Sequence, residues 1–372
     1  MAKTNGAPAG HEDFPEEWRS ASDLPEEWNE EEFGLIQPRF SAGELLEHLI
    51  HDPEPVTGRD LYAFSDLSRS DAEVVRREWS AIPTERRRTV IQNLIDLAEN
   101  DLHWHLGRIL RIALQDKDAE VRRKAIEGLW EEIEQDLLGP LIDALRRDED
   151  DGVRAAAAAA LGNFVLAGEL DELDAALAMR AEQALLEVLR NSAEPLQVQS
   201  RALESIAYSG ETGVRQLIED AYYSPHEPLR VSALVAMGRS ADVHWRGYVR
   251  AELQSPEVAM RAEAARACGE LEAVSAVNEL LQLLMDEAQP VRLAAIFALG
   301  RIGGKDAREA LRLISAEGNQ VESEAAEEAL EEMLFFGEER SIALFDDEDD
   351  DEDADGDIWD IDDDDDLGEY ET

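Results

Sequence analysis

The sequence has very little cysteine and few long apolar stretches, and each shortage excludes something. Its single cysteine, Cys268, rules out an internal disulfide and suits a reducing compartment. No run of about 18 apolar residues occurs, so no membrane span is expected. The first ten residues lack the apolar stretch of a secretory signal. We therefore expect a cytoplasmic protein.

Basic residues are also scarce. The 35 Lys and Arg residues stand against 86 Asp and Glu residues, which gives a formal net charge of −51. Such a charge repels nucleic acid and anionic membranes and attracts basic proteins. The expected partners are therefore proteins with a basic surface, with no nucleic acid and no membrane.

Motifs for catalysis or ligand binding are missing too. The sequence has no Gly-rich phosphate loop, no Ser-His-Asp arrangement and no paired cysteines with metal spacing. His48 and His51 lie three residues apart, but a metal ion would need a third ligand from elsewhere. We expect a solvated helix face there, and no cofactor, metal or catalytic residue in the chain.

What the sequence does contain is an internal repeat. Blocks such as VRRKAIEGLW at Val121, VRAAAAAALG at Val153 and VRLAAIFALG at Val291 recur in register. Related blocks begin at Val90, Val198, Leu229, Met260 and Val321, at steps of 30 to 32 residues with one step of 45. An apolar helical segment precedes the blocks. This pattern predicts about eight two-helix units over residues 83–336.

Each block carries local signals for the second helix of its unit. Alanine at the fifth and eighth positions, Ala157 and Ala160 in one copy, predicts close helix packing. The glycines that follow several blocks predict helix C-caps: Gly162, Gly238, Gly269 and Gly300. The residues six before each block's arginine predict N-caps: Asp116, Asp148, Ser224, Ser255 and Asp286. The long step contains an insertion near 167–181, which predicts an extra or extended helix.

The pattern D-x-D-x-x-V-R-x-x-A-x-x-x-L, as in Asp116–Leu129 and Asp148–Leu161, resembles HEAT repeats. The short period and the VRxxAAxALG wording look most like the HEAT-like repeats of the phycobilisome (bilin) lyase type. This resemblance implies an all-α fold, an α-solenoid (armadillo-type superhelix) whose second helices line the concave face.

The resemblance also implies a stacked ladder in which Asp and Arg side chains of adjacent units meet. Its members here would be Asp116, Asp148, Asp286, Arg122, Arg154, Arg230, Arg261 and Arg292. Serine replaces the Asp in two copies, and Gln199 replaces one arginine. We expect the arginines to be structural rather than ligand-binding.

Two enzyme families share this type of repeat. Deoxyhypusine hydroxylases carry paired His-Glu motifs that hold iron, whereas His-Glu occurs here only at His11-Glu12 and His226-Glu227, so that activity is not expected. Bilin lyases lack a compact signature, and a HEAT-like enzyme or enzyme subunit stays the alternative. Cys268 occupies an apolar block position, which predicts a buried thiol rather than a nucleophile.

The segments outside the repeats divide the chain further. Residues 1–40 predict a disordered acidic arm, and residues 41–82 predict helices that cap the solenoid, opened by a capping box of Ser41 and Glu44. Residues 337–372 predict a disordered acidic tail. From Asp346 onward the tail has 18 acidic residues and no basic ones.

From these features we predict a non-catalytic scaffold or adaptor that presents a concave solenoid surface to a protein partner. Its acidic tails would assist capture of a basic partner. Three kinds of residue are candidates for partner contact: apolar anchors in the tails, a basic point in one block, and the alanine run. They are Ile358, Trp359, Ile361, Trp18, Trp28, Arg123, Lys124 and Ala156.

Overall fold

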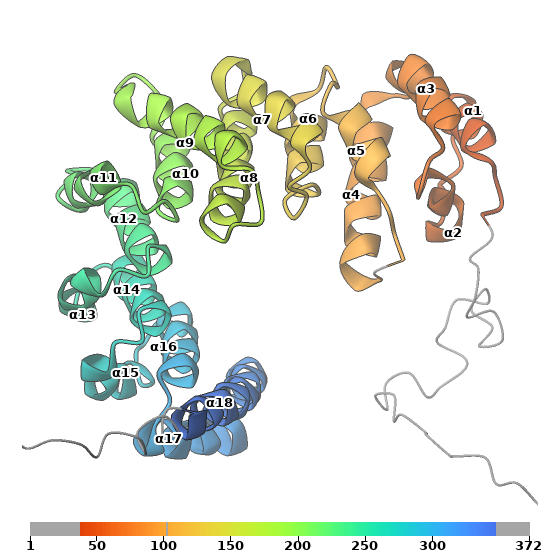
Figure 1. The fold of residues 1–372 in the computed structure, drawn as a ribbon. Coiled ribbons are helices and arrows are strands. Elements are labelled where there is room, and N and C mark those ends of the chain that lie inside the picture. The colour runs from red at the N-terminus through yellow and green to blue at the C-terminus, as the bar shows by residue number, and fades with distance from the viewer. Residues whose placement is uncertain (1–37, 102, 347–372) are drawn as a thin grey trace, which may run out of the picture. The chain divides into compact units, whose positions relative to one another are not determined.

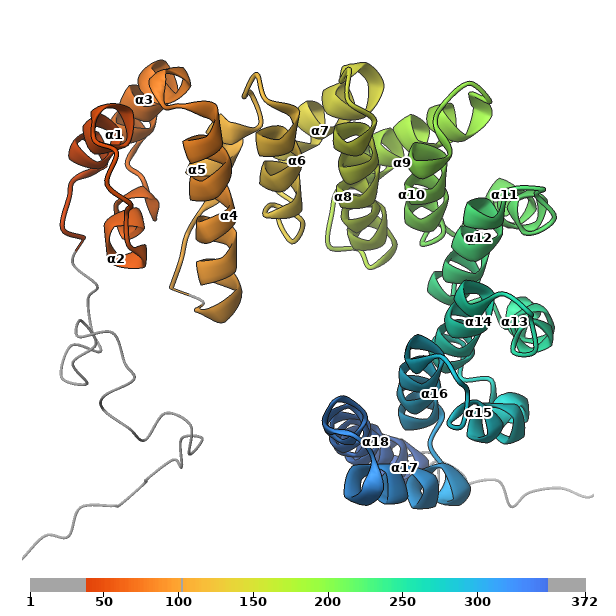
Figure 2. The same cartoon turned by 180° about the vertical axis from the view of Figure 1, so that it is seen from behind.

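The structure is a computed structural model that describes residues 38–101 and 103–346. The chain divides into two compact units, which meet in the sequence between Leu129 and Trp130. Within the described ranges every regular element is helical and no strand occurs (Figures 1 and 2). None of these helices combines the length and the apolar character needed to cross a membrane. The predicted all-α fold is confirmed.

Unit 1 contains two rows of helices. The first row consists of α1 (Ala42–His51), α3 (Arg69–Glu78) and α5 (Gly107–Ala113), each in contact with the next. The second consists of α2 (Gly58–Leu61), α4 (Thr84–Asn100) and α6 (Ala119–Glu127). One 3₁₀ turn, Tyr62–Phe64, lies between α2 and α3, and a second, Trp79–Ala81, lies between α3 and α4. The capping box of Ser41 and Glu44 opens α1 as predicted.

Unit 2 contains six helix pairs, and in unit 1 the blocks that begin at Val90 and Val121 lie on α4 and α6. Its first helices are α7 (Gln135–Arg147), α9 (Ala175–Arg190), α11 (Thr212–Tyr222), α13 (Arg246–Glu252), α15 (Val277–Leu283) and α17 (Lys305–Glu317). Its second helices are α8 (Asp151–Glu169), α10 (Leu196–Ile206), α12 (Glu227–Arg239), α14 (Val258–Glu270), α16 (Gln289–Ile302) and α18 (Gln320–Asp346). The turns Val243–Trp245 and Val274–Ala276 precede α13 and α15.

The second helices of unit 2 form its inner row. Figures 1 and 2 show α8, α10, α12, α14 and α16 on the inside of the curve that the unit describes. Each contacts the next second helix extensively, whereas neighbouring first helices touch far less. Because the inner row is spaced more tightly than the outer row, the unit bends toward its second helices.

Glycines and alanines account for the tight inner row. A β-carbon built on Gly269 would lie 2.7 Å from the Cα of Ala298 on the next second helix. The same construction on Gly300 gives 3.1 Å to the Cα of Ala329. Such distances leave no room for a side chain, so glycine is required by close approach rather than by backbone conformation.

The predicted C-cap role of these glycines is wrong. Gly162, Gly238, Gly269 and Gly300 all lie inside helices. The C-cap residues of α8, α12 and α14 are Leu170, Ser240 and Leu271. The sequence pattern is ambiguous because a glycine near a helix end serves either purpose. Only the position of the neighbouring helix distinguishes them.

The alanine run is more constrained than its block positions predict. Ala157 and Ala160 are buried as predicted, but Ala155 and Ala158 are buried as well. Only Ala156 and Ala159 keep exposed surface. The run belongs to α8, which is longer than every other second helix except α18. Four alanines of the run face neighbouring elements.

The insertion lengthens helices and adds none. Residues near 167–181 extend the end of α8 and the beginning of α9, with a short turn between them. At the other end of the unit, α18 reaches Asp346 and so includes the first residues of the segment 337–372, for which composition predicts disorder. The rest of that segment, like residues 1–37, lies outside the described residues.

Gly269→Ala tests the close approach. The added methyl group would clash with Ala298, and we expect a loss of about 1–3 kcal/mol in the free energy of unfolding, measured by urea denaturation. Gly247→Ala is the matched control, because a β-carbon there meets no described atom within 4 Å. The control should leave stability unchanged or raise it by up to about 1 kcal/mol. Equal effects at the two positions would contradict the packing role.

Candidate functional site

The arginines at the second block position share one hydrogen bond. In each case an Nη1 atom donates to the backbone carbonyl six residues earlier, just before the second helix begins. The pairs are Arg122 to Asp116 at 2.8 Å, Arg154 to Asp148 at 2.8 Å, Arg230 to Ser224 at 3.3 Å, Arg261 to Ser255 at 2.9 Å and Arg292 to Asp286 at 2.8 Å. This bond holds the loop between the two helices of each pair.

Most of these arginines also reach a carboxylate of the next repeat. Arg154 donates to Glu194 at 2.6 Å. Arg261 binds both oxygens of Asp286, at 2.9 and 3.0 Å. Arg292 donates twice to Glu322, at 2.8 and 2.6 Å. Planar guanidinium groups suit such paired contacts, so the arginines join successive repeats.

Arg230 has the loosest contact of the series, since its nearest carboxylate is Glu257 at 3.9 Å. Gln199, which replaces an arginine, still donates to the carbonyl of Glu194 at 2.6 Å. The loop contact therefore survives the substitution.

The ladder uses different acidic residues from those that the resemblance implies. Asp286, one of the three predicted aspartates, binds the predicted arginine Arg261 through its carboxylate. The carboxylate of Asp116 instead accepts from Arg87 at 2.7 Å and from the indole of Trp79 at 2.6 Å. Asp148 accepts from the backbone N–H of Asp150 at 3.0 Å. Glutamates bind two of the other arginines, Glu194 at Arg154 and Glu322 at Arg292, and a search for Asp alone could not find them.

The predicted N-caps are also displaced by two residues. The helices α6 and α8 are capped by Asp118 and Asp150, and α16 begins after Ala288. The residues two positions earlier form turns instead: Asp116, for example, accepts from the N–H of Asp118 at 2.8 Å. Asp and Ser make such turns for the same reason that they cap helices, namely a short side-chain acceptor.

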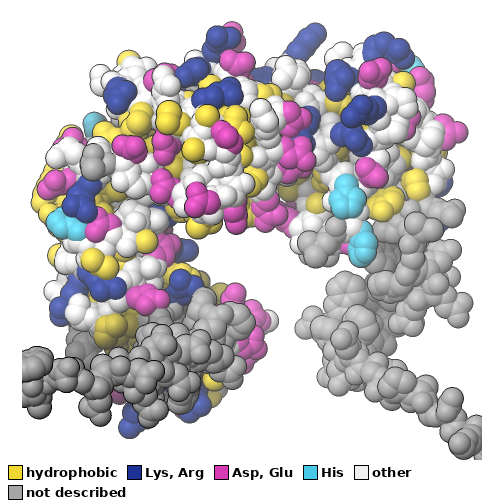
Figure 3. Space-filling view, in the orientation of Figure 1, with side chains coloured by type: hydrophobic (Ala, Val, Ile, Leu, Met, Phe, Trp, Pro, Cys, Tyr) yellow, Lys and Arg dark blue, Asp and Glu magenta, His cyan; other side chains and the backbone are white. Residues whose placement is uncertain are grey.

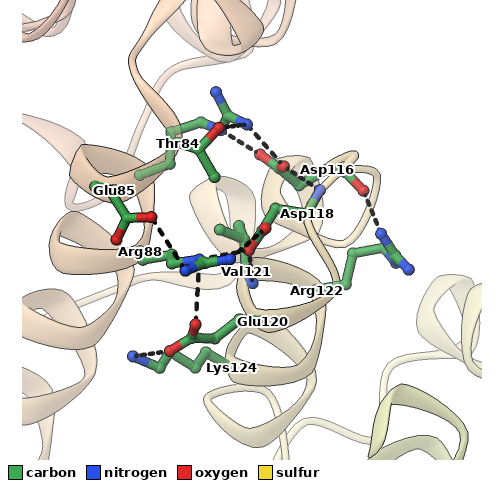
Figure 4. Close-up of polar contacts among 10 residues, drawn as sticks. Thr84, Glu85, Arg88, Asp116, Asp118, Glu120, Val121, Arg122 and Lys124 are labelled. Carbon is green, nitrogen blue, oxygen red and sulfur yellow. Dashed lines mark hydrogen bonds and ion pairs between the residues drawn. The ribbon is translucent and has the colours of Figure 1, made fainter. Parts of the chain in front are cut away.

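In unit 1 two arginines outside the blocks, Arg87 and Arg88, add further contacts between repeats. Arg88 binds both oxygens of Asp118, at 2.8 and 2.7 Å, and this contact lowers the pKa of Asp118 (Figure 4). Arg87 is buried and paired with Asp116. The charge of Arg87 is thus compensated by a carboxylate 29 residues later in the sequence.

A second set of residues forms a continuous line along the inner row of unit 2. We call it the inner stripe; it consists of the fourth, seventh and eleventh positions of the blocks, which fall on one face of a helix. Its members are Ala156, Ala159, Asn163, Arg201, Glu204, Tyr208, Ser232, Val235, Arg239, Glu263, Arg266, Glu270, Ala294, Phe297 and Arg301. All except Glu204, Ser232 and Ala294 keep exposed surface.

Charged and hydroxyl side chains are linked within the inner stripe. Glu204 accepts from the hydroxyl of Ser232 at 2.6 Å and from Arg201 at 2.7 Å. Arg239 donates to the backbone carbonyl of Glu204 at 3.0 Å and lies over the ring of Tyr208. These bonds connect α10 and α12 and hold the polar groups in fixed positions.

Two carboxylates of the inner stripe are held in an unfavourable environment. Burial raises the pKa of Glu263 and of Glu270, and nearby arginines only partly offset this effect. Glu263 has an ion-pair distance of 3.6 Å to Arg266. Glu270 lies over Gly238, where a β-carbon would come within 1.9 Å of its Oε2 atom. Gly238 therefore makes room for Glu270, and α12 and α14 together define the polar centre of the stripe.

The structure places the predicted contact residues unevenly. Ala156 lies at the α8 end of the inner stripe and is partly exposed. Arg123 and Lys124 lie on α6 in unit 1, where they pair with Glu127 at 2.6 Å and Glu120 at 3.3 Å. Five candidates lie outside the described residues: Trp18, Trp28, Ile358, Trp359 and Ile361.

Sequence reasoning missed the charged part of the inner stripe. The signal was available: Arg201, Glu204, Glu263 and Arg266 occupy positions that other copies fill with alanine or valine. A single block cannot show that the side chains of adjacent copies meet. On the face seen in Figure 3, acidic and basic side chains lie beside one another rather than in separate patches.

No metal or nucleophilic centre emerges from the part of the chain that the structure describes. It contains no cluster of three or more His, Cys, Asp or Glu side chains arranged to hold a metal ion. His48 and His51 instead approach Asp52 and Glu47, at 3.4 and 3.3 Å. Cys268 is buried as predicted, and burial raises its pKa to about 12, so it stays a thiol at neutral pH.

Comparison with known proteins supports the repeat class. A family model of HEAT repeats matches residues 108–183 and 248–331. The chain therefore contains HEAT repeats, which confirms the class predicted from the blocks. No curated protein matches the sequence.

Several solved structures are similar in fold. The complex of CpcE and CpcF of phycocyanin lyase from Nostoc sp. PCC7120 is 20% identical, with a TM-score of 0.43, over 61% of this chain and 93% of that chain. Human deoxyhypusine hydroxylase is 17% identical, with a TM-score of 0.33, over 72% and 96%. Importin beta is 16% identical, with a TM-score of 0.41, over 80% and 43%.

Asp286→Asn tests the ladder. Arg261 lowers the pKa of Asp286, so the carboxylate contributes stability above its ordinary pKa, and this contribution is lost as pH falls through the lowered value. We expect a loss of about 1–3 kcal/mol at pH 7, measured by urea denaturation, that shrinks in acid. Asp143→Asn removes an exposed partner of Arg147 and should cost at most about 0.5 kcal/mol. A pH-independent loss would contradict the pairing.

Glu263→Gln tests the unfavourable carboxylate. Because the folded-state pKa of Glu263 is raised, its ionised form opposes folding at pH values above that pKa. The variant should gain about 0.5–2 kcal/mol in unfolding free energy at pH 7.5. The gain should shrink as pH falls through the raised pKa toward the ordinary value for glutamate, where the wild type is protonated. A variant less stable than the wild type at pH 7.5 would show that ionised Glu263 stabilises the fold.

Proposed function

We propose that this protein is a non-catalytic scaffold that binds a protein partner along the inner stripe of unit 2. The observation that carries the proposal is the line of exposed side chains over α8, α10, α12, α14 and α16, which ends at the small residues Ala156 and Ala159. Curved repeat arrays bind partners on such surfaces because the repeats present side chains at regular spacing.

The electrostatics of the inner stripe support a binding role. A carboxylate whose pKa is raised by burial weakens the fold, and such costs concentrate at functional sites. Glu263 and Glu270 lie among Arg239, Arg266 and Arg301, so the stripe presents both signs of charge within a few residues. This arrangement favours a partner segment with complementary charges of both signs, and it favours specificity over raw affinity.

The net charge of −51 supports a basic partner overall. Acidic segments at both ends of the sequence would raise the rate of encounter, and this effect is screened by salt. The buried single cysteine suits a reducing compartment, and we propose the cytoplasm.

The proposal is tested by partner capture followed by direct binding measurements. The full chain is used as bait in its native cell, the partner is identified by mass spectrometry, and its affinity is measured by calorimetry. Ala156→Glu and Ala156→Lys add bulk to the exposed end of the stripe; sister blocks carry Glu263 and Lys124 there, so folding should be unchanged. We expect both variants to weaken binding at least tenfold, with Lys the weaker binder of a basic partner.

Met179→Glu is the matched control, because Met179 is exposed on α9 in the outer row. It should bind as the wild type does. A chain that ends at Asp346 should lose affinity at low salt and differ little from the full chain at high salt. Unchanged binding by both Ala156 variants, or iron or a chromophore in the purified protein, would contradict the proposal.

A further inference from the structure

One joint of unit 2 differs from its neighbours in how its arginine is paired. Arg230 of α12 makes a 3.3 Å hydrogen bond to the carbonyl of Ser224 and lies 3.9 Å from Glu257. At the next two joints, Arg261 and Arg292 each make two hydrogen bonds of 3.0 Å or less to a carboxylate. Within the described part of the chain, Arg230 thus makes no carboxylate contact as short as those of Arg261 and Arg292.

Two sequence positions account for the different pairing of Arg230. Arg261 is bound by Asp286, 25 residues later, and Arg292 is bound by Glu322, 30 residues later. At the Arg230 joint, Ser255 corresponds to Asp286, and the block position of Glu322 is held by Arg261. Neither side chain carries a carboxylate, so neither place supplies an acidic partner for Arg230.

An open cavity of about 430 Å³ lies in front of Arg230. Its lining includes Tyr222, Tyr223, Ser224, Ser255 and Met260, so Ser255, which stands in the place of Asp286, faces this space. Tyr223 is 68% exposed and makes an edge-to-face contact with Tyr222 at 5.0 Å between ring centroids. The cavity therefore combines one cation, hydroxyl donors and an exposed aromatic surface.

The two carboxylates that line the cavity have other partners. Glu252 accepts from the hydroxyl of Tyr222 at 2.6 Å, and Glu257 accepts from the hydroxyl of Ser255 at 2.9 Å. Burial and this bond to Glu252 raise the pKa of Tyr222, so its hydroxyl remains protonated. A carboxylate that binds Arg230 directly through two hydrogen bonds would be held more strongly than Glu257 is at 3.9 Å.

We propose that this cavity binds a carboxylate on a peptide segment of a partner protein, with an adjacent aromatic side chain against Tyr223 and Met260. The carboxylate takes the place that Asp286 and Glu322 occupy at the sister joints. The site lies at a joint between repeats and uses none of the inner stripe, so it is a second site, separate from the one proposed above.

The probe for the test is N-acetyl-Glu-Trp-amide, titrated into the full chain and followed by saturation-transfer NMR and calorimetry. N-acetyl-Gln-Trp-amide has the same shape without the charge, and inorganic phosphate tests whether any anion suffices. We expect the Glu peptide to bind at least tenfold more tightly than the Gln peptide, and phosphate not to compete with it. Equal binding of the two peptides, or displacement by phosphate, would overturn the proposal for a carboxylate.

Two variants locate the site. Arg230→Gln should reduce binding of the Glu peptide at least tenfold. Ser255→Asp places a carboxylate where Asp286 stands in the next repeat, so it should also reduce binding and should raise the melting temperature. Arg312 is exposed on α17, and Arg312→Gln is the control. This variant should bind the Glu peptide as the wild type does.

Retained binding in Arg230→Gln would overturn the proposal, and this variant decides the matter if Ser255→Asp does not fold. Bound peptide that also protects the inner stripe in hydrogen exchange would place the contact elsewhere and would equally overturn it. Because Ala156→Lys should leave peptide binding unchanged, failure here and failure of the inner-stripe proposal are distinguishable.

Discussion

The close approach of successive second helices is the constraint on which unit 2 depends. Gly269 against Ala298 and Gly300 against Ala329 leave no space for a β-carbon, so these helices pack at the distance set by their backbones. The first helices carry larger side chains and lie further apart. Since the two rows have different spacings but equal numbers of helices, the unit must curve, and the curvature places the second helices on the inside.

That packing leaves only some faces of each second helix available for polar interactions. The second block position points to the loops, and there arginine joins repeats through a carbonyl of its own repeat and a carboxylate of the next. The fourth, seventh and eleventh positions point away from the first helices, and there the charged residues of α10, α12 and α14 meet. The structural contacts and the proposed binding surface thus lie on different faces of each helix, and this explains why most blocks keep arginine at the second position while the fourth, seventh and eleventh positions vary.

The two proposed sites have a common physical origin. Each lies where a repeat departs from its sisters: Glu263 stands where sister blocks have Ala156 and Ala294, and Ser255 stands where the next joint has Asp286. In a repeat array such departures alter one surface without disturbing the packing of the next repeat. Arg230 holds the same block position as its sister arginines, so the shape of the joint is retained. Its side chain lines the open cavity.

The sequence by itself determined the repeat, its class and many of the residues that pack, because these follow from periodicity and residue size along one chain. It placed Ala157, Ala160 and Cys268 correctly in the interior. It could not assign Gly162 or Gly269, because a glycine at a helix end and a glycine at a close contact look alike until the neighbouring helix is known. It also could not name Glu194 or Glu322 as ladder partners. Which carboxylate reaches which arginine is decided by the stacking of repeats, and contacts between residues 25 to 40 positions apart exist only in the tertiary structure.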